Sequence, residues 1–250
     1  MKTRVHHKRK EYQINLAKPL DISIPIHGGP SNVNAWYVKH PEIRPHVDGD
    51  FIGSVAEGAS TNFNDIWFNP HAHGTHIECV GHITKEFYSI NKNLNTFFFL
   101  AELVTIAPGK LNDDFVISKK QLQNAIKNQD LEALVIRTLP NTNAKLSRQY
   151  SHANPPYFLE EAMEFLVELG VKHLLVDLPS VDKEKDDGKL LAHKAFWNLN
   201  GDVRQDATIT EFIYIPNTIG DGDYFLNLQV APFENDASPS RPVLYKIKTL

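Results

Sequence analysis

Two short apolar runs separated by a helical pattern constrain the fold of this chain more than any other feature. Residues 133–139 (ALVIRTL) and 173–179 (HLLVDLP) have the length and continuous apolar character of strands buried on both faces. The segment between them ends at Gly170 and carries an apolar stripe at helical spacing, formed by Leu159, Ala162, Met163, Leu166 and Leu169. Because a strand–helix–strand unit returns the chain in the same direction, we predict a parallel pair of strands.

Other segments extend this unit into a mixed sheet. Residues 20–26 (LDISIPI) alternate in polarity, and residues 100–108 (LAELVTIAP) form another run, so both predict strands. Ser118 is placed to cap a helix with apolar positions at Leu122, Ala125 and Ile126. Residues 208–216 and 224–232 flank the turn-rich spacer NTIGDGD, which predicts a hairpin.

The length and composition limit the class of protein. A chain of 250 residues suits one sizeable α/β domain, which we place at residues 16–250 after an N-terminal arm at residues 1–15. The net charge of −4 disfavours a nucleic-acid partner, and no run approaches the roughly 18 apolar residues of a membrane helix. No apolar segment follows the basic patch at residues 6–10, and Cys79 is the sole cysteine. We therefore expect a cytoplasmic protein without disulfides.

Four of the twelve histidines fall within residues 69–83, NPHAHGTHIECVGHI. His71, His76 and Glu78 supply two imidazoles and a carboxylate, which are usual ligands of catalytic zinc, manganese or iron. His82 lies a further turn away, where it is suited to proton transfer. The alternatives are a histidine-rich surface loop and core histidines bonded to backbone carbonyls, and the spacing alone leaves them open.

Aromatic residues cluster on either side of this stretch, at Trp36, Tyr37, Trp67 and Phe68. They could line a pocket for an aromatic substrate or pack in the core. We expect core packing.

The stretch HGTHIECVGH resembles the signature His-x-Gly-Thr-His-x-Asp-x-Pro-x-His of the cyclase-type metal-dependent hydrolases, a family that includes bacterial kynurenine formamidase and isatin hydrolase. Further segments are similar to family elements in the same order along the chain: LDISIPI, LVIRT, VDLPSVD, AHKAF, TITEFIYI and ASPSRPV. The resemblance extends from about residue 16 to the end of the chain. Several motifs in the correct order are far more specific than any one of them.

The resemblance implies a role for each matching residue. His76 and Glu78 would be metal ligands, His82 would be the catalytic acid–base, and His193 and Glu211 would complete a second metal position or surround the first. Glu211 also interrupts an apolar strand, where a buried carboxylate is costly unless it is paired or bound to metal.

Three departures from the family pattern stand out. Ala72 occupies the place of the first histidine, so His71 or His73 must substitute, and we expect His71. Glu78 replaces the usual Asp, and CVGH replaces a segment that normally contains proline.

The resemblance also implies a fold and an activity. The expected fold is the swivelling β/β/α type in a homo-oligomer, a dimer or a tetramer, with one or two divalent ions of zinc or manganese. The expected reaction is hydrolysis of a carbon–nitrogen bond in a small-molecule amide, with an aryl formamide such as N-formylkynurenine as the leading candidate. Two alternatives remain: hydrolysis of a cyclic amide or lactone, and a non-catalytic metal- or ligand-binding protein. His82 argues against the second, because such a protein needs no proton carrier beside its metal.

Overall fold

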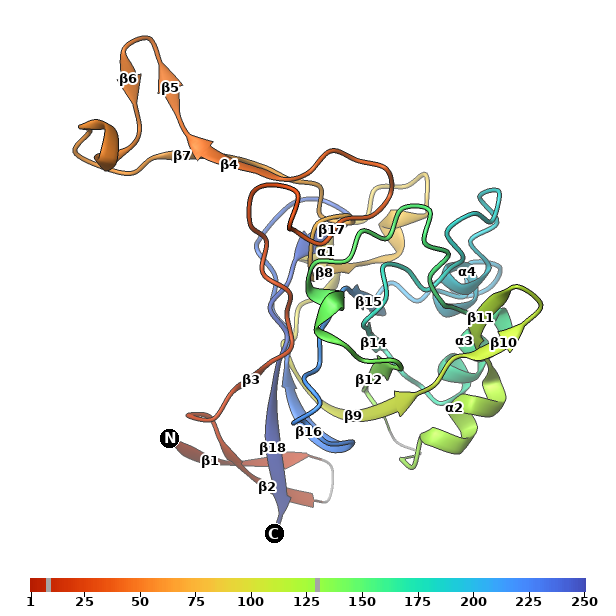
Figure 1. The fold of residues 1–250 in the computed structure, drawn as a ribbon. Coiled ribbons are helices and arrows are strands. Elements are labelled where there is room, and N and C mark those ends of the chain that lie inside the picture. The colour runs from red at the N-terminus through yellow and green to blue at the C-terminus, as the bar shows by residue number, and fades with distance from the viewer. Residues whose placement is uncertain (8–9, 129–130) are drawn as a thin grey trace.

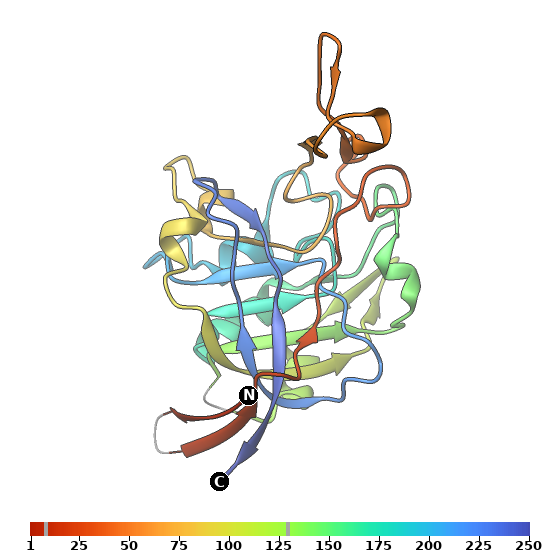
Figure 2. The same cartoon turned by 90° about the vertical axis from the view of Figure 1, so that its left-hand side faces the viewer.

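One large mixed sheet organises the chain in the computed structural model, which describes residues 1–7, 10–128 and 131–250 (Figures 1 and 2). In spatial order its strands are β1 (Lys2–His7), β2 (Lys10–Asn15), β18 (Val243–Thr249), β16 (Gly222–Asn227), β9 (Phe98–Ile106), β12 (Ala133–Thr138), β14 (His173–Val176), β15 (Thr208–Glu211), β8 (His76–Glu78) and β17 (Ala237–Pro239). The short strand β3 (Leu20–Asp21) pairs with β18. The predicted single-domain α/β fold with a mixed sheet is confirmed.

The centre of the sheet is parallel, as the apolar runs predict. Strand β12 pairs in parallel with β9 on one side and with β14 on the other, with Ala133 opposite His173. Every residue of β12 and β14 is buried. These strands therefore need an apolar layer on both faces.

Helices provide one of those layers. Helix α2 (Lys119–Ala125) begins at Ser118, whose side chain forms a capping box with Gln121. Helix α3 (Glu160–Glu168) buries Ala162, Met163 and Leu166 of its predicted stripe, whereas Leu159 and Leu169 cap its two ends and are partly buried. Helix α4 (Leu191–Phe196) packs beside it. The remaining short elements are α1 (Ile90–Asn93), a three-stranded sheet of β10 (Gly109–Leu111), β11 (Asp114–Ile117) and β13 (Tyr157–Phe158), and the 3-10 turns η2 (Val80–His82) and η3 (Asn143–Leu146). Within the described ranges, the helices are too short or too polar to cross a membrane.

The predicted hairpin of residues 208–216 and 224–232 is wrong. Strand β15 lies between β14 and β8, and β16 lies between β9 and β18, so both edges of each strand are already occupied. Arg137 holds the spacer between them, because its guanidinium donates to the Ile219 carbonyl at 2.7 Å and to Asp221 at 2.9 Å. The turn-rich composition was a correct signal for a loop, but the loop connects strands that do not pair.

Two hairpins extend from opposite ends of the body. At one end β1 and β2 pair with each other, and β2 continues the sheet onto β18; Lys8 and Arg9 of the basic patch lie outside the described residues. At the other end residues 42–68, which we call the arm, project away from the body (Figures 1 and 2). The arm comprises β4 (Glu42–Pro45), β5 (Val47–Asp48), β6 (Phe51–Ile52), the 3-10 turn η1 (Val55–Glu57) and β7 (Asn64–Trp67). The division of the chain at residue 15 stays a prediction.

Candidate metal centre

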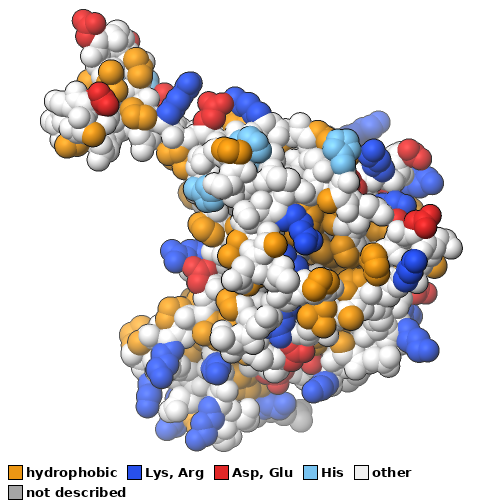
Figure 3. All heavy atoms as spheres, in the orientation of Figure 1, with side chains coloured by type: hydrophobic (Ala, Val, Ile, Leu, Met, Phe, Trp, Pro, Cys, Tyr) orange, Lys and Arg blue, Asp and Glu red, His pale blue; other side chains and the backbone are white. Residues whose placement is uncertain are grey.

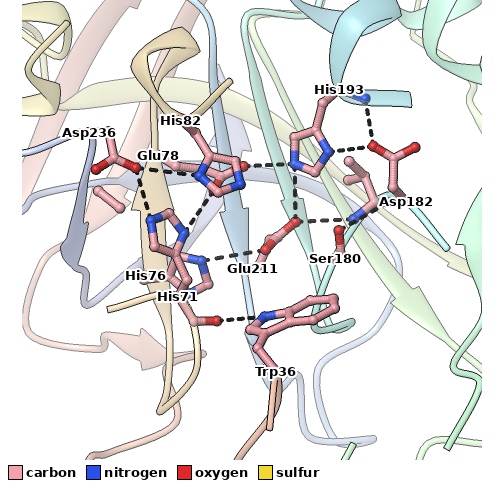
Figure 4. Close-up of polar contacts among 12 residues, drawn as sticks. Trp36, His71, His76, Glu78, His82, Ser180, Asp182, His193, Glu211 and Asp236 are labelled. Carbon is pink, nitrogen blue, oxygen red and sulfur yellow. Dashed lines mark hydrogen bonds and ion pairs between the residues drawn. The ribbon is translucent and has the colours of Figure 1, made fainter. Parts of the chain in front are cut away.

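Four elements, together with the turn before β8 that carries His71, bring the predicted site residues to one point (Figure 4). Strand β8 carries His76 and Glu78, which point to the same side because side chains two apart share a face of a strand. Glu211 lies directly opposite His76 on β15. His82 ends the η2 turn that follows β8, and His193 comes from α4. The pairing of β8 with β15 thus joins residues that are 135 positions apart.

Glu78 is at the centre of the cluster and is fully buried. Its Oε1 lies 3.0 Å from His193 Nε2, and its Oε2 lies 3.2 Å from His71 Nδ1 and 3.7 Å from His82 Nε2. Burial alone would raise the pKa of Glu78, but the surrounding imidazoles, first that of His82, hold it well below its usual range. Glu78 is therefore an anion that three histidines share.

Two buried atoms of the cluster lack a hydrogen-bond partner in the described part of the chain. His76 Nε2 lies 3.4 Å from Glu211 Oε2, and Glu78 Oε2 lies near His71, but neither contact has hydrogen-bonding geometry. An unpaired buried nitrogen or carboxylate oxygen is costly unless something else binds it. Imidazole nitrogen and carboxylate oxygen are both ligand atoms that suit zinc or manganese, so the residues present fit a divalent metal ion.

The donor atoms group into overlapping triads whose members lie within 4.8 Å of one another. One triad is His71, His76 and Glu78, and a second is Glu78, His82 and His193. Glu78 belongs to both, so its two oxygens could each face a different ion. The geometry can accommodate either one ion or two.

His71 and His73 have different surroundings. His71 faces Glu78, whereas His73 is fully buried outside the cluster. The Asn69 amide donates to His73 Nδ1 at 2.8 Å, so the proton of the neutral ring sits on Nε2, which donates to the Lys39 carbonyl at 2.9 Å. Both nitrogens of His73 are occupied, and the ring connects Lys39 to Asn69, the residues just outside the two ends of the arm.

Two aspartates support the imidazoles from behind. Asp182 accepts from the backbone amides of Ala192 and His193 and lies 2.5 Å from His193 Nδ1, which fixes both the start of α4 and the ring. Asp236 Oδ2 lies 2.9 Å from His71 Nε2 and 3.4 Å from His82 Nδ1. A carboxylate in this position orients a metal-binding or proton-carrying histidine and increases its basicity.

These carboxylates also set the charge of the histidines. Burial would lower the pKa of His71, but Asp236 and Glu78 raise it to about 10. Burial would also lower the pKa of His193, but Asp182 and Glu78 raise it well above the ordinary value of a histidine. Because a metal binds the neutral imidazole, loading the site would release protons, and metal affinity should increase with pH.

Sequence reasoning missed Asp236 and assigned no role to Asp182. Asp182 falls within the segment VDLPSVD, so its position was signalled, although its contact with His193 was not. Asp236 directly precedes β17, which pairs with β8 so that Ala237 lies opposite Glu78. That register, which the sequence does not reveal, places Asp236 beside the histidines.

A cleft of about 300 Å³ leads to the cluster, and its lining includes Trp36, His71, His82, His193 and Glu211. The indole Nε1 of Trp36 donates to the His71 carbonyl at 3.1 Å. The expectation of core packing is wrong for Tyr37 and Trp67, which are 52% and 39% exposed. Trp36 and Tyr37 both adopt a φ of 60°, a strained region for bulky residues that is found mostly at functional sites.

Comparison with known proteins gives a consistent result. A family model named Cyclase matches residues 14–183. Kynurenine formamidase from Bacillus cereus is 25% identical over 229 residues, which cover 91% of this chain and 97% of that protein. Among solved structures, a protein described as a predicted metal-dependent hydrolase from Bacillus stearothermophilus aligns with a TM-score of 0.64 at 18% identity, covering 91% of this chain and 98% of the other. Isatin hydrolase A from Ralstonia solanacearum aligns with a TM-score of 0.62 at 15% identity, covering 91% of each chain.

Proposed function

Because this chain belongs to the Cyclase family and is a hydrolase, we propose that it hydrolyses the carbon–nitrogen bond of a small-molecule amide at a centre of one or two zinc or manganese ions. The observation that carries the proposal is the buried carboxylate of Glu78 between three imidazoles, with an oxygen that has no hydrogen-bond partner. The leading substrate is an aryl formamide such as N-formylkynurenine, since the kynurenine formamidases align over nearly their whole length. We also propose that the enzyme is a cytoplasmic homo-oligomer, a dimer or a tetramer.

The ligand set divides around Glu78. His71, His76 and Glu78 would hold one ion. Glu78, His193 and Glu211 would hold a second: Glu211 Oε1 lies 3.9 Å from His193 Nε2, and its use in place of His82 leaves that imidazole free to carry a proton. A divalent ion in such a site polarises a substrate carbonyl and acidifies water. The buried positions of His76, His193 and Glu211 keep bulk water away from the donors.

His82 is the group best placed to move the proton. Its side chain is 30% exposed, more than the other two imidazoles within reach of Glu78, so a substrate in the cleft can contact it. His82 would take a proton from the attacking water and return it to the departing amine nitrogen. Asp236, 3.4 Å from His82 Nδ1, would hold the ring so that Nε2 faces the reaction.

Trp36 would contribute to binding rather than to chemistry. Its indole lines the cleft and is fixed by its bond to the His71 carbonyl, so it offers a rigid face to an aryl ring. Hydrolysis of a cyclic amide or lactone would use the same residues and remains the second candidate. A non-catalytic binding protein is disfavoured, because it needs neither the half-open His82 nor the aspartate behind it.

The test uses purified protein with its metal content measured. Activity is assayed against aryl formamides, cyclic amides and lactones before chelation, after chelation, and after addition of zinc or manganese. We expect formamide hydrolysis to be lost on chelation and regained with metal, and we expect His27→Ala, a substitution outside the cluster, to respond as the wild type does. Full activity in demonstrably metal-free protein would refute the proposal. Turnover of lactones alone would select the second candidate.

A further inference from the structure

Glu184 lies on a charged loop, residues 183–190, which connects Asp182 to helix α4. Figure 3 shows charged side chains of both signs over this loop, beside α4 at the upper right of the view. Most of the loop is exposed, but the side chain of Glu184 is partly buried and lines the cleft that leads to the histidine cluster. A carboxylate held away from water needs hydrogen-bond partners.

Three hydrogen bonds occupy the carboxylate of Glu184. Its Oε1 accepts from the Tyr37 hydroxyl and from the backbone amide of His152, both at 2.5 Å, and its Oε2 accepts from the amide of Asn154 at 2.9 Å. Burial would raise the pKa of Glu184, but these bonds lower it below the ordinary value. Glu184 is therefore an anion at neutral pH that joins two other segments of the chain to its own loop.

The two segments that Glu184 joins have strained backbones. Trp36 and Tyr37 each have a φ of 60°. In the second segment, His152 has a φ of 65° and Asn154 a φ of 44°. Side chains other than glycine persist in this left-handed region only where surrounding contacts hold them. The rings of Tyr37 and His152 also lie 4.7 Å apart, so the contacts of both segments converge on the carboxylate.

Trp36 connects this strained backbone to the histidine cluster (Figure 4). Its indole Nε1 donates to the His71 carbonyl at 3.1 Å, and the side chain lines the same cleft as Glu184. One hydrogen bond at the indole does not fix the plane of the ring. The backbone conformation at Trp36 and Tyr37 supplies the second constraint, and Glu184 holds that conformation through the Tyr37 hydroxyl.

We propose that Glu184 is a positioning residue that holds Trp36 in the cleft and so sets the affinity for the aryl part of the substrate. Glu184 acts through Tyr37 on the backbone of Trp36, and it takes no part in proton transfer or metal binding. The proposal rests on the function proposed above for the identity of the substrate. The position of Trp36, in contrast, can be measured without turnover.

Steady-state kinetics with formanilide, a simple aryl formamide, test the effect on affinity. Glu184→Ala removes all three hydrogen bonds and should raise KM about threefold to tenfold, the contribution of one aromatic contact, with kcat little changed. Glu184→Gln keeps an acceptor for the Tyr37 hydroxyl and should raise KM less. Trp36→Ala should raise KM as Glu184→Ala does, and the two substitutions together should add nothing further, because both remove the same contact.

Two tyrosines provide a matched pair of variants. Tyr37→Phe removes the hydroxyl that binds Glu184 and should raise KM. Tyr224→Phe should leave KM unchanged, because its hydroxyl donates to the Gly220 carbonyl on a loop far from the cleft. Three strands lie between β16, which carries Tyr224, and β15.

Acrylamide quenching of fluorescence reports the position of Trp36 in protein that turns over nothing. The chain has three tryptophans, of which Trp67 is exposed on the arm and Trp197 is fully buried. In a Trp67→Phe background, quenching therefore reports Trp36. Adding Glu184→Ala should raise the quenching constant about twofold or more, because the strained backbone that holds the indole is released.

The outcomes separate this proposal from the proposed function. A wild type that does not hydrolyse formanilide would refute the function, and quenching would still decide whether Glu184 holds Trp36. An unchanged quenching constant, or KM effects of Glu184→Ala and Trp36→Ala that multiply, would overturn the positioning role. A fall in kcat with loss of metal would also overturn it, because Glu184 would then act through Asp182 on His193. Circular dichroism verifies folding, and Tyr37→Phe, which removes a single hydroxyl, carries the same test if Glu184→Ala does not fold.

Discussion

His71 and His73 lie two residues apart but have different surroundings, which allows the metal ligand to be assigned to one of them. We predict that His71→Ala loses most of the bound metal, and that its metal-free form also loses the contacts of His71 with Glu78 and Asp236. His73→Ala should keep its metal and lose stability. The reason is that His71 Nδ1 lies 3.2 Å from Glu78, whereas both nitrogens of His73 are bonded to the backbone.

The magnitude for His73 follows from what its ring does. Removing it breaks two hydrogen bonds, each contributing about 1 kcal/mol, and leaves a cavity where a fully buried ring had packed against Trp67. The sum is about 3 kcal/mol. For a chain of this size, 1 kcal/mol corresponds to roughly 2–4 °C in Tm, so the midpoint should fall by about 6–12 °C.

Two measurements on each variant decide the matter. Metal content after dialysis reports ligation, and thermal unfolding of the chelated proteins reports stability without a contribution from metal binding. His73→Asn serves as a partial control, since a shorter side chain with one donor and one acceptor can restore at most part of the bonding. If His73→Ala lost the metal while His71→Ala retained it, the ligand would be His73 and the reasoning from ring contacts would be wrong.

Three further predictions concern single side chains. His82→Ala should keep its metal but lose roughly 10²–10⁴-fold in kcat, without rescue by added metal, as measured by steady-state kinetics with metal analysis. Glu78→Asp retracts the carboxylate by one C–C bond of about 1.5 Å, which breaks the 3.2 Å contact with His71, so metal affinity in titrations should fall and activity should recover with excess metal. Burial lowers the pKa of His173 from 6.5 to about 4, so between these pH values the unfolded chain binds a proton that the folded chain does not bind. The contribution of neutral His173 to the free energy of unfolding is therefore fully present above pH 6.5 and decreases by about 3 kcal/mol as the pH falls towards 4. In urea unfolding, we expect the free energy of unfolding of His173→Gln to depend less on pH than that of the wild type.

The elements predicted best from the sequence are those whose signal lies in neighbouring residues and whose apolar positions are buried in the structure. Strand β12 and helix α3 appeared as predicted, because an apolar run of six residues and a stripe at helical spacing are each read from neighbouring positions. The capped helix at Ser118 was predicted for the same reason, since a capping box lies within four residues. The family was also predicted correctly, because its motifs follow one another in order along the chain.

Prediction failed where long-range pairing decides the outcome. Strands β15 and β16 were predicted to pair with each other because they are close in sequence, but each has two other neighbours in the sheet. The contribution of Asp236 depends on the pairing of β17 with β8, which joins segments about 160 residues apart. The exposed arm was also missed, since nothing in the sequence of residues 42–68 shows whether their apolar side chains are covered by the body.

Two of the three departures from the family signature become connected in the structure. The first histidine is displaced by one residue, to His71, and the carboxylate at position 78 is longer by one methylene. In space the longer side chain places Oε2 3.2 Å from Nδ1 of His71, while Ala72, at the usual position of the histidine, is fully buried and offers no ligand atom. With both changes present, the donor atoms of His71, His76 and Glu78 lie within 4.8 Å of one another. We infer that the two changes compensate for each other, so a motif read one position at a time leaves the ligand set undecided.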